Sequence, residues 1–210
     1  LLWTGLLAQA EDSTDRDGCR VDATSMSAGP FEARLWSIRN TTQQTKVLQH
    51  FDAGSIPVDL GVPASQLKIL GTGGLSDVTS APGSYMWIAV VEPKTRRGVV
   101  AGWQGTSRGS GVLIPKVVDD KVILSARLEF GRLQLEPNES ASLEHLLVGK
   151  FDDARLGLEA YANAVAQSMQ IRLPPQPCGY CTWYHAGSSS EKRIAPLTRF
   201  ASEQLKPFGF

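Results

Sequence analysis

Between about residues 30 and 150, short apolar runs alternate with polar segments, and no helical repeat separates them. Polar and apolar residues alternate within the last two runs, which is typical of strands with one buried face. Asp119-Asp120 predicts a hairpin turn. GTGG at 71–74 predicts another turn, because it lacks the Lys-Ser/Thr pair of a phosphate-binding loop. Many short strands joined by such turns predict an antiparallel β-sandwich. The predicted strands are 33–40, 46–53, 84–92, 98–105, 110–118, 121–130 and 132–137.

From Phe151 the apolar spacing becomes helical, in the segment FDDARLGLEAYANAVAQSMQ. Asp152 or Asp153 can cap this helix by accepting its free amide hydrogens, and Pro174-Pro175 stops it. We therefore expect a helix within residues 151–173 that links a β domain at 11–150 to a second unit. The predicted buried stripe of this helix is Leu156, Ala160, Tyr161, Ala164, Val165 and Met169.

The second unit, residues 174–210, has the pattern strand, loop, helix and the start of another strand. GYCTWYH at 179–185 is a predicted buried strand, and Ser188 to Glu191 forms a capping-box pattern before a helix. Pro196 either kinks that helix or is its first residue. This pattern is that of the first repeat of a β/α barrel or of another α/β domain. A single β/α unit cannot close a sheet, so we expect a fragment that is cut at both ends. The predicted architecture is mostly β: a sandwich, a linker helix and the first unit of a truncated barrel.

Lysine plus arginine and aspartate plus glutamate both number 21, so the formal net charge is zero. Nucleic-acid binding needs a basic surplus or patch, and none is present. LLWTGLLAQA at 1–10 resembles the end of a secretory signal, which predicts export; a buried N-terminal element is the alternative. No run approaches the roughly 18 apolar residues of a membrane span. Export permits disulfides, but Cys19 stands alone and is expected to be free.

PCGYCTWYHAG at 177–187 combines two cysteines, aromatic residues and a histidine. A redox pair needs the first thiol at a helix start, whereas this segment has strand character. Haem attachment needs a histidine directly after the second cysteine. Cys178, Cys181 and His185 give only three of the four ligands of a structural zinc site. We expect no metal and no cofactor, and the redox state of the two cysteines stays open.

The alternative is that this strand lines a pocket. Alternation points Cys181, Trp183 and His185 to one side, and the end of a barrel strand lies at the mouth where catalysis occurs. A tryptophan there offers a flat apolar face on which a sugar can stack. On composition alone, a plain core role for Trp183 is equally compatible.

PCGYCTWYHAG, followed by SSEK and FASEQLKPFGF, resembles the opening of the catalytic barrel in α-galactosidase-like glycoside hydrolases of the melibiase clan, of the family 36 type. The resemblance covers about residues 174–210, and the preceding sandwich agrees only in arrangement. The family typically has G-W-C-S-W-Y in this strand. Gly179, Cys181 and Trp183-Tyr184 match it, whereas Tyr180 replaces a tryptophan and Thr182 a serine. The resemblance implies that Trp183 lines the galactose subsite.

The same resemblance implies a retaining reaction that uses two aspartates. In the family these aspartates lie on later strands, so both catalytic residues are expected beyond residue 210 and this chain alone is expected to be inactive. Asp152-Asp153 is better explained as a helix cap. The predicted substrate-binding residues are Trp183, Tyr184, His185 and Trp103, the last because AGWQG suggests a turn near the barrel mouth.

Two alternatives remain for the function. In the first alternative the enzyme transfers galactose to another sugar instead of hydrolysing the bond, as the relatives that make raffinose do. In the other, the sandwich is a non-catalytic carbohydrate-binding module, with Trp36, Trp87 and Trp103 as a sugar platform unless these rings are core residues.

Overall fold

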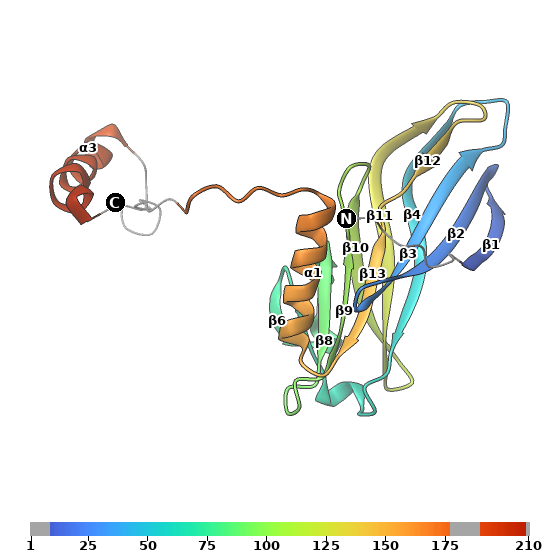
Figure 1. The fold of residues 1–210 in the computed structure, drawn as a ribbon, viewed down its shortest axis with the longest axis horizontal. Coiled ribbons are helices and arrows are strands. Elements are labelled where there is room, and N and C mark those ends of the chain that lie inside the picture. The colour runs from blue at the N-terminus through green and yellow to red at the C-terminus, as the bar shows by residue number, and fades with distance from the viewer. Residues whose placement is uncertain (1–8, 177–189, 209–210) are drawn as a thin grey trace. The chain divides into compact units, whose positions relative to one another are not determined.

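The computed structural model describes residues 9–176 and 190–208 (Figure 1). The chain forms two compact units, one ending at Ile171 and the other running from Arg172 to Phe210. The first unit holds all the described strands and one α-helix. The second contains only helical elements among its described residues.

Two antiparallel sheets form the first unit, as the sequence predicts. The large sheet has nine strands in the order β1-β2-β3-β13-β9-β8-β5-β6, with β12 paired to β3. Its strands are β1 (Gln9–Arg16), β2 (Cys19–Ala28), β3 (Phe31–Asn40), β5 (Lys68–Gly71), β6 (Gly74–Asp77), β8 (Trp87–Val91), β9 (Gly98–Trp103), β12 (Ser140–Ser142) and β13 (Leu146–Phe151). The small sheet has the order β4-β11-β10-β7, with β4 (Lys46–Val58), β7 (Ser84–Tyr85), β10 (Ser110–Val118) and β11 (Lys121–Leu135). Short 3₁₀ turns lie at Ala64–Gln66 and Val78–Ser80.

Each predicted strand overlaps with observed strands. The predicted strand 84–92 is wrong as a single strand, because it divides into β7 and β8, which belong to different sheets. The two runs from 121 to 137 are one strand, β11. Its alternation changes phase at Gly131, which has a φ of +66° and marks a break in register against β4. The predicted turn at Asp119 and Asp120 is confirmed, because both have positive φ and connect Val118 to its partner Lys121. The sequence reasoning missed β1, β2, β5, β6, β12 and β13. β2 illustrates the reason, since CRVDATSMSA has few large apolar residues.

The main core lies between the two sheets, and Trp103 is its largest fully buried side chain. Its ring packs near Trp36, with the two centroids 6.0 Å apart. On the facing strand, Gly111 leaves room for the indole: a Cβ at this position would lie 2.1 Å from Cδ1 of Trp103. The indole therefore fits only because the opposite strand has no side chain there.

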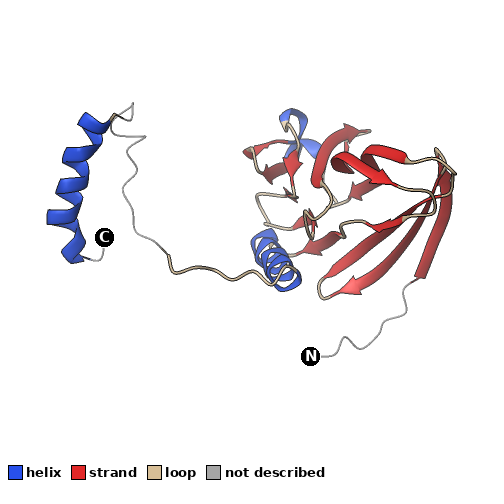
Figure 2. Cartoon of the chain, turned by 90° about the horizontal axis from the view of Figure 1, so that it is seen from above, coloured by secondary structure: helices blue, strands red, loops and turns tan. Residues whose placement is uncertain are grey.

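A second core lies between the large sheet and helix α1 (Ala154–Ser168), whose neighbours in the sheet are β8, β9 and β13. Figures 1 and 2 show this helix beside the strands of the first unit. Asp153 caps this helix by accepting the backbone N–H of Arg155 at 3.0 Å, which confirms the predicted cap. The predicted buried stripe is partly wrong, since Leu156 is 61% exposed and Met169 46%. The buried residues of α1 are Ala154, Gly157 and Tyr161. The helix therefore belongs to the same compact unit as the sandwich.

Tyr161 fixes the helix on β9. Its ring lies against Gly102, where a Cβ would come within 2.4 Å of the ring carbon Cε2. Its hydroxyl donates to the carbonyl oxygen of Trp103 at 2.7 Å. The Tyr161 ring thus packs on backbone that Gly102 leaves uncovered, and its hydroxyl forms a hydrogen bond to the same strand.

The second unit contains α3 (Glu191–Phe200), a π-helical turn at Ala201–Leu205 and a 3₁₀ turn at Lys206–Phe208. Ser190 precedes α3 as its N-cap residue, but its side chain makes no capping hydrogen bond. Pro196 lies inside α3 rather than at its start. The predicted strand 179–185 lies outside the described residues, so the first barrel unit stays a prediction.

We expect Gly102→Ala to destabilise the first unit by about 1–3 kcal/mol, because the new methyl group overlaps the Tyr161 ring. Gly105→Ala is a matched control, since its Cβ would lie 3.7 Å from the nearest atom, Cγ of Glu144. Urea unfolding followed by circular dichroism measures both. Equal unfolding free energies for the two variants would contradict the proposed fit.

Burial raises the pKa of Tyr161 far above its ordinary value near 10. The stability this provides is present below about pH 10, where both states are protonated, and is lost as the pH rises and only the unfolded chain ionises. We expect Tyr161→Phe to cost about 1 kcal/mol at pH 7 through loss of the hydrogen bond to Trp103. At pH 11 the difference in unfolding free energy between the Tyr161→Phe variant and the parent protein should be smaller. Urea midpoints at both pH values test this, and a gap independent of pH would contradict it.

Candidate functional site

Three of the four predicted sugar-binding residues, Trp183, Tyr184 and His185, lie outside the described residues, as do Cys178 and Cys181. Their roles stay predictions. The fourth, Trp103, is 0% exposed and sits in the core between the sheets. Its burial excludes stacking on a sugar in the folded unit, so the core interpretation is correct for this ring. Of the two glycines beside it, Gly102 is closely packed against the Tyr161 ring, and Gly105 follows the end of β9.

The predicted platform of three tryptophans is not formed. Trp36 packs on the core between the sheets, whereas Trp87 packs on the other core, against helix α1. Trp36 also contacts the Phe51 ring edge-on at a centroid distance of 5.8 Å. Because the three rings serve two separate cores, they do not present one common surface to a ligand.

A hollow of about 720 Å³ lies in the first unit, beside α1 and the turn that joins β2 to β3. We call it the α1 hollow. One face of α1 lines it, because Ala160, Ala164 and Ser168 follow one another at four-residue spacing, as do Asn163 and Gln167. The polar lining residues are Ser27, Gln104, His145, Asn163, Gln167 and Ser168.

Two residues at the ends of adjacent strands complete the α1 hollow. Gln104 follows β9 and His145 precedes β13, and the N–H of Gln104 donates to the carbonyl oxygen of His145 at 2.8 Å. The Gln104 side-chain amide donates to the carbonyl oxygen of Ala164 at 3.3 Å, which ties the strand end to the helix. Burial lowers the pKa of His145, although the neighbouring Glu144 acts in the opposite direction. The imidazole is therefore neutral at pH 7.

Glu144, which precedes His145 in the sequence, contacts the loop between β9 and β10. It is 7% exposed, and its Oε1 accepts the backbone N–H groups of Arg108 at 2.5 Å and Gly109 at 3.3 Å. This carboxylate anchors the loop between β9 and β10. Since that loop begins at Gln104, the anchor also holds one wall of the α1 hollow in place.

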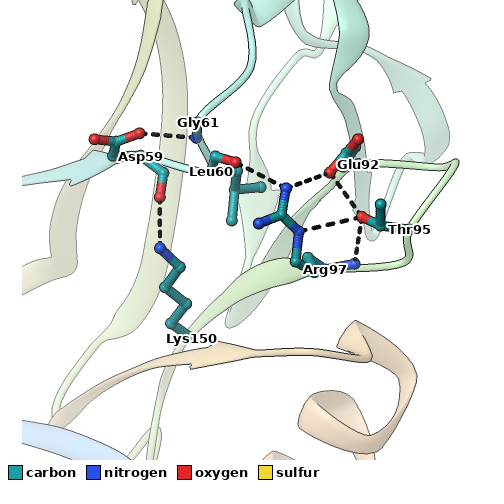
Figure 3. Close-up of polar contacts among 7 residues, drawn as sticks. All are labelled: Asp59, Leu60, Gly61, Glu92, Thr95, Arg97 and Lys150. Atoms are coloured by element: carbon teal, nitrogen blue, oxygen red, sulfur yellow. Dashed lines mark hydrogen bonds and ion pairs between the residues drawn. The ribbon is translucent and has the colours of Figure 1, made fainter.

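A second polar cluster joins the two sheets at the end of β4, and Figure 3 shows its contacts. Glu92 accepts from Thr95 at 2.6 Å and from Arg97 at 2.9 Å, and Arg97 also donates to the carbonyl oxygen of Leu60 at 3.2 Å. Lys150 donates to the carbonyl oxygen of Asp59 at 3.0 Å. We call this cluster the clasp, because large-sheet residues hold the chain that leaves the small sheet.

The clasp does not have the properties of a catalytic site. Hydrogen bonds from Thr95 and Arg97 lower the pKa of Glu92, so this carboxylate is ionised and engaged. Asp153 is similar: its hydrogen bonds with Arg155 lower its pKa to about 2. Both carboxylates hold structure together, which agrees with the interpretation of Asp152-Asp153 as a helix cap.

Cys19 is a free cysteine and is 1% exposed. Burial raises the pKa of its thiol, and this outweighs the opposing effect of Lys46. The expectation of a free cysteine is confirmed. Within residues 9–176 and 190–208, no three histidine, cysteine or acidic side chains are grouped to hold a metal. Among the described helices, none combines the length and the apolar character that a membrane-spanning helix needs.

Neither a protein-family model nor a curated protein sequence matches this chain. Among solved structures, an α-galactosidase from Lactobacillus brevis matches 80% of this chain and 28% of its own length, with a TM-score of 0.54 and 10% identity. A GH36 α-galactosidase from Geobacillus stearothermophilus in complex with stachyose matches 74% and 24%, with a TM-score of 0.50 and 14% identity. A galactose mutarotase related enzyme from Lactobacillus acidophilus matches 69% and 71%, with a TM-score of 0.47 and 9% identity. The chain spans about a quarter of the length of the two α-galactosidases, with which it shares the fold.

Sequence reasoning missed the α1 hollow because its lining comes from four separate parts of the chain: residues 27–31, Gln104, His145 and helix α1. Gln104, His145 and Asn163 are ordinary polar residues in their local contexts. One local signal was present: Asn163 and Gln167 are four residues apart on the polar side of the predicted helix. That signal predicts a shared face but not what lies opposite it.

We expect Arg97→Met to lower the urea midpoint at pH 7, because it removes a partner of a buried carboxylate and of Leu60. The lowered pKa of Glu92 provides stability that is present above its unfolded pKa, near 4.3, and is lost as the pH falls. The difference from the parent should therefore shrink below about pH 4. Lys116→Met, at an exposed position, is the control. A loss of the same size at pH 7 and pH 3 would argue against the clasp.

Proposed function

We propose that this chain is the N-terminal part of a retaining glycoside hydrolase that acts on α-galactosides or related α-linked sugars. The observation that carries the proposal is the order of two features in one chain. A sandwich whose fold is shared with two α-galactosidases is followed by a segment, 177–187, that resembles the opening of their catalytic barrel. Either feature alone is weaker evidence for this function. The shared fold in particular does not determine the function, because one fold is found with many functions.

In this proposal Trp183 stacks on the apolar face of a galactose ring, with Tyr184 and His185 beside it at the end of the first barrel strand. The carboxylate nucleophile and the acid/base residue lie on later strands, beyond residue 210. Retention requires these two carboxyl groups to be about 5–5.5 Å apart, so that a covalent glycosyl intermediate forms and is then hydrolysed. We also propose export, from the apolar segment at residues 1–10.

Within the first unit, contacts of Asp153 and Tyr161 hold helix α1 on the sandwich. Asp153 begins α1 and Tyr161 holds it on β9, so the point at which the chain leaves the sandwich is fixed. After Ser168 the chain continues through Pro174-Pro175, which prevents the helix from extending. Transfer of galactose to a second sugar would use the same covalent intermediate, with a sugar hydroxyl in place of water.

The test uses the protein expressed from its complete coding sequence, assayed with p-nitrophenyl α-galactoside. We expect cleavage with retention of the anomeric configuration, and proton NMR of the released sugar measures this configuration. Trp183→Ala should lower kcat/KM by at least about tenfold, the cost of losing an aromatic stacking contact. Trp87→Phe, a conservative change in the sandwich, should leave kcat/KM within about twofold. Absence of cleavage of any aryl α-glycoside would overturn the proposal.

A further inference from the structure

We propose that the α1 hollow is a binding site for a neutral saccharide, separate from the segment that contains Trp183. The inference goes beyond the proposed function, because it assigns ligand binding to the sandwich unit itself. It rests on the chemistry of the lining, on how that lining is held, and on the size of the hollow.

The lining offers hydrogen bonds without charge. It has three carboxamides, two serine hydroxyls and one imidazole, and no aspartate, glutamate, lysine or arginine. Carboxamides and hydroxyls both donate and accept, which is what sugar hydroxyls also do. A charged ligand would lose its hydration here without gaining a counter-charge. The chemistry therefore selects a neutral ligand rich in hydroxyl groups.

The remaining lining is apolar, and it comes from the β2–β3 turn and from α1. Pro30 and Ala28 lie on the turn side, and Ala160 and Ala164 lie on the helix side. A pyranose has apolar C–H faces between its hydroxyls, and these can cover such surfaces while the hydroxyls reach the amides. The aromatic ring in the lining, Phe31, is 3% exposed and so offers little stacking area. We therefore expect weak binding, in the millimolar range.

Part of the site is already in position. The Gln104 amide is fixed by its bond to Ala164, and the helix is fixed by Tyr161. Asn163 and Gln167 are exposed on the same face of α1, with about 5–6 Å between Cβ atoms at this spacing. These two amides can therefore address different hydroxyls of one ring. The volume of about 720 Å³ lies within the range of about 300–1,000 Å³ usual for small-molecule sites.

The test is an NMR titration of the ¹⁵N-labelled 210-residue chain with methyl α-D-galactoside and, separately, with D-glucose. We expect saturable shifts of the side-chain amides of Gln104, Asn163 and Gln167 and of the backbone at 28–31. The double variant Asn163→Ala/Gln167→Ala should weaken binding at least about tenfold. Both positions are exposed on a helix in which alanine is favourable, so this variant should fold, as checked by circular dichroism.

Two controls separate this site from others. Gln66→Ala, which removes an exposed amide elsewhere, should leave the affinity unchanged, and so should Trp183→Ala. Loss of the shifts in Trp183→Ala, or shifts confined to residues 177–189, would overturn the proposal. So would the absence of shifts up to about 100 mM of either sugar, or tighter binding of triglycine amide at the same residues. None of these results depends on α-galactoside cleavage, so failure here is distinguishable from failure of the proposed function.

Discussion

The contact between Tyr161 and Gly102 determines how the first unit is assembled. Strand β9 has a core on each side, and both approach its backbone closely at its end. On one side the Tyr161 ring takes the space that a side chain at residue 102 would fill, and its hydroxyl bonds the next carbonyl. On the other side Trp103 fills the space left by Gly111. Helix α1 therefore packs on one side of β9, and the core between the sheets packs on its other side.

The α1 hollow lies beside the same helix. Its lining combines residues of α1 and of the β2–β3 turn with Gln104 and His145, which lie at the ends of adjacent strands. The clasp acts at another place, where Arg97 and Lys150 hold the end of β4.

Local signals in the sequence were sufficient for much of the fold. The turn at Asp119-Asp120 and the cap at Asp153 depend on neighbouring residues, and the sequence predicts both correctly. The burial of Trp103 depends instead on Gly111 from another strand, so the local pattern AGWQG misled. The α1 hollow was invisible for the same reason. β2 was missed because its pairing with β3 and β1, rather than its own composition, makes it a strand.

Cys19 gives this protein a built-in reporter of partial opening. Its thiol is covered, and burial disfavours the reactive thiolate, so alkylating reagents can modify it only when its surroundings open. It begins β2, one strand in from the edge of the large sheet. The rate of Cys19 alkylation would therefore measure how often strands β1 and β2 at the edge of the large sheet open, independently of global unfolding.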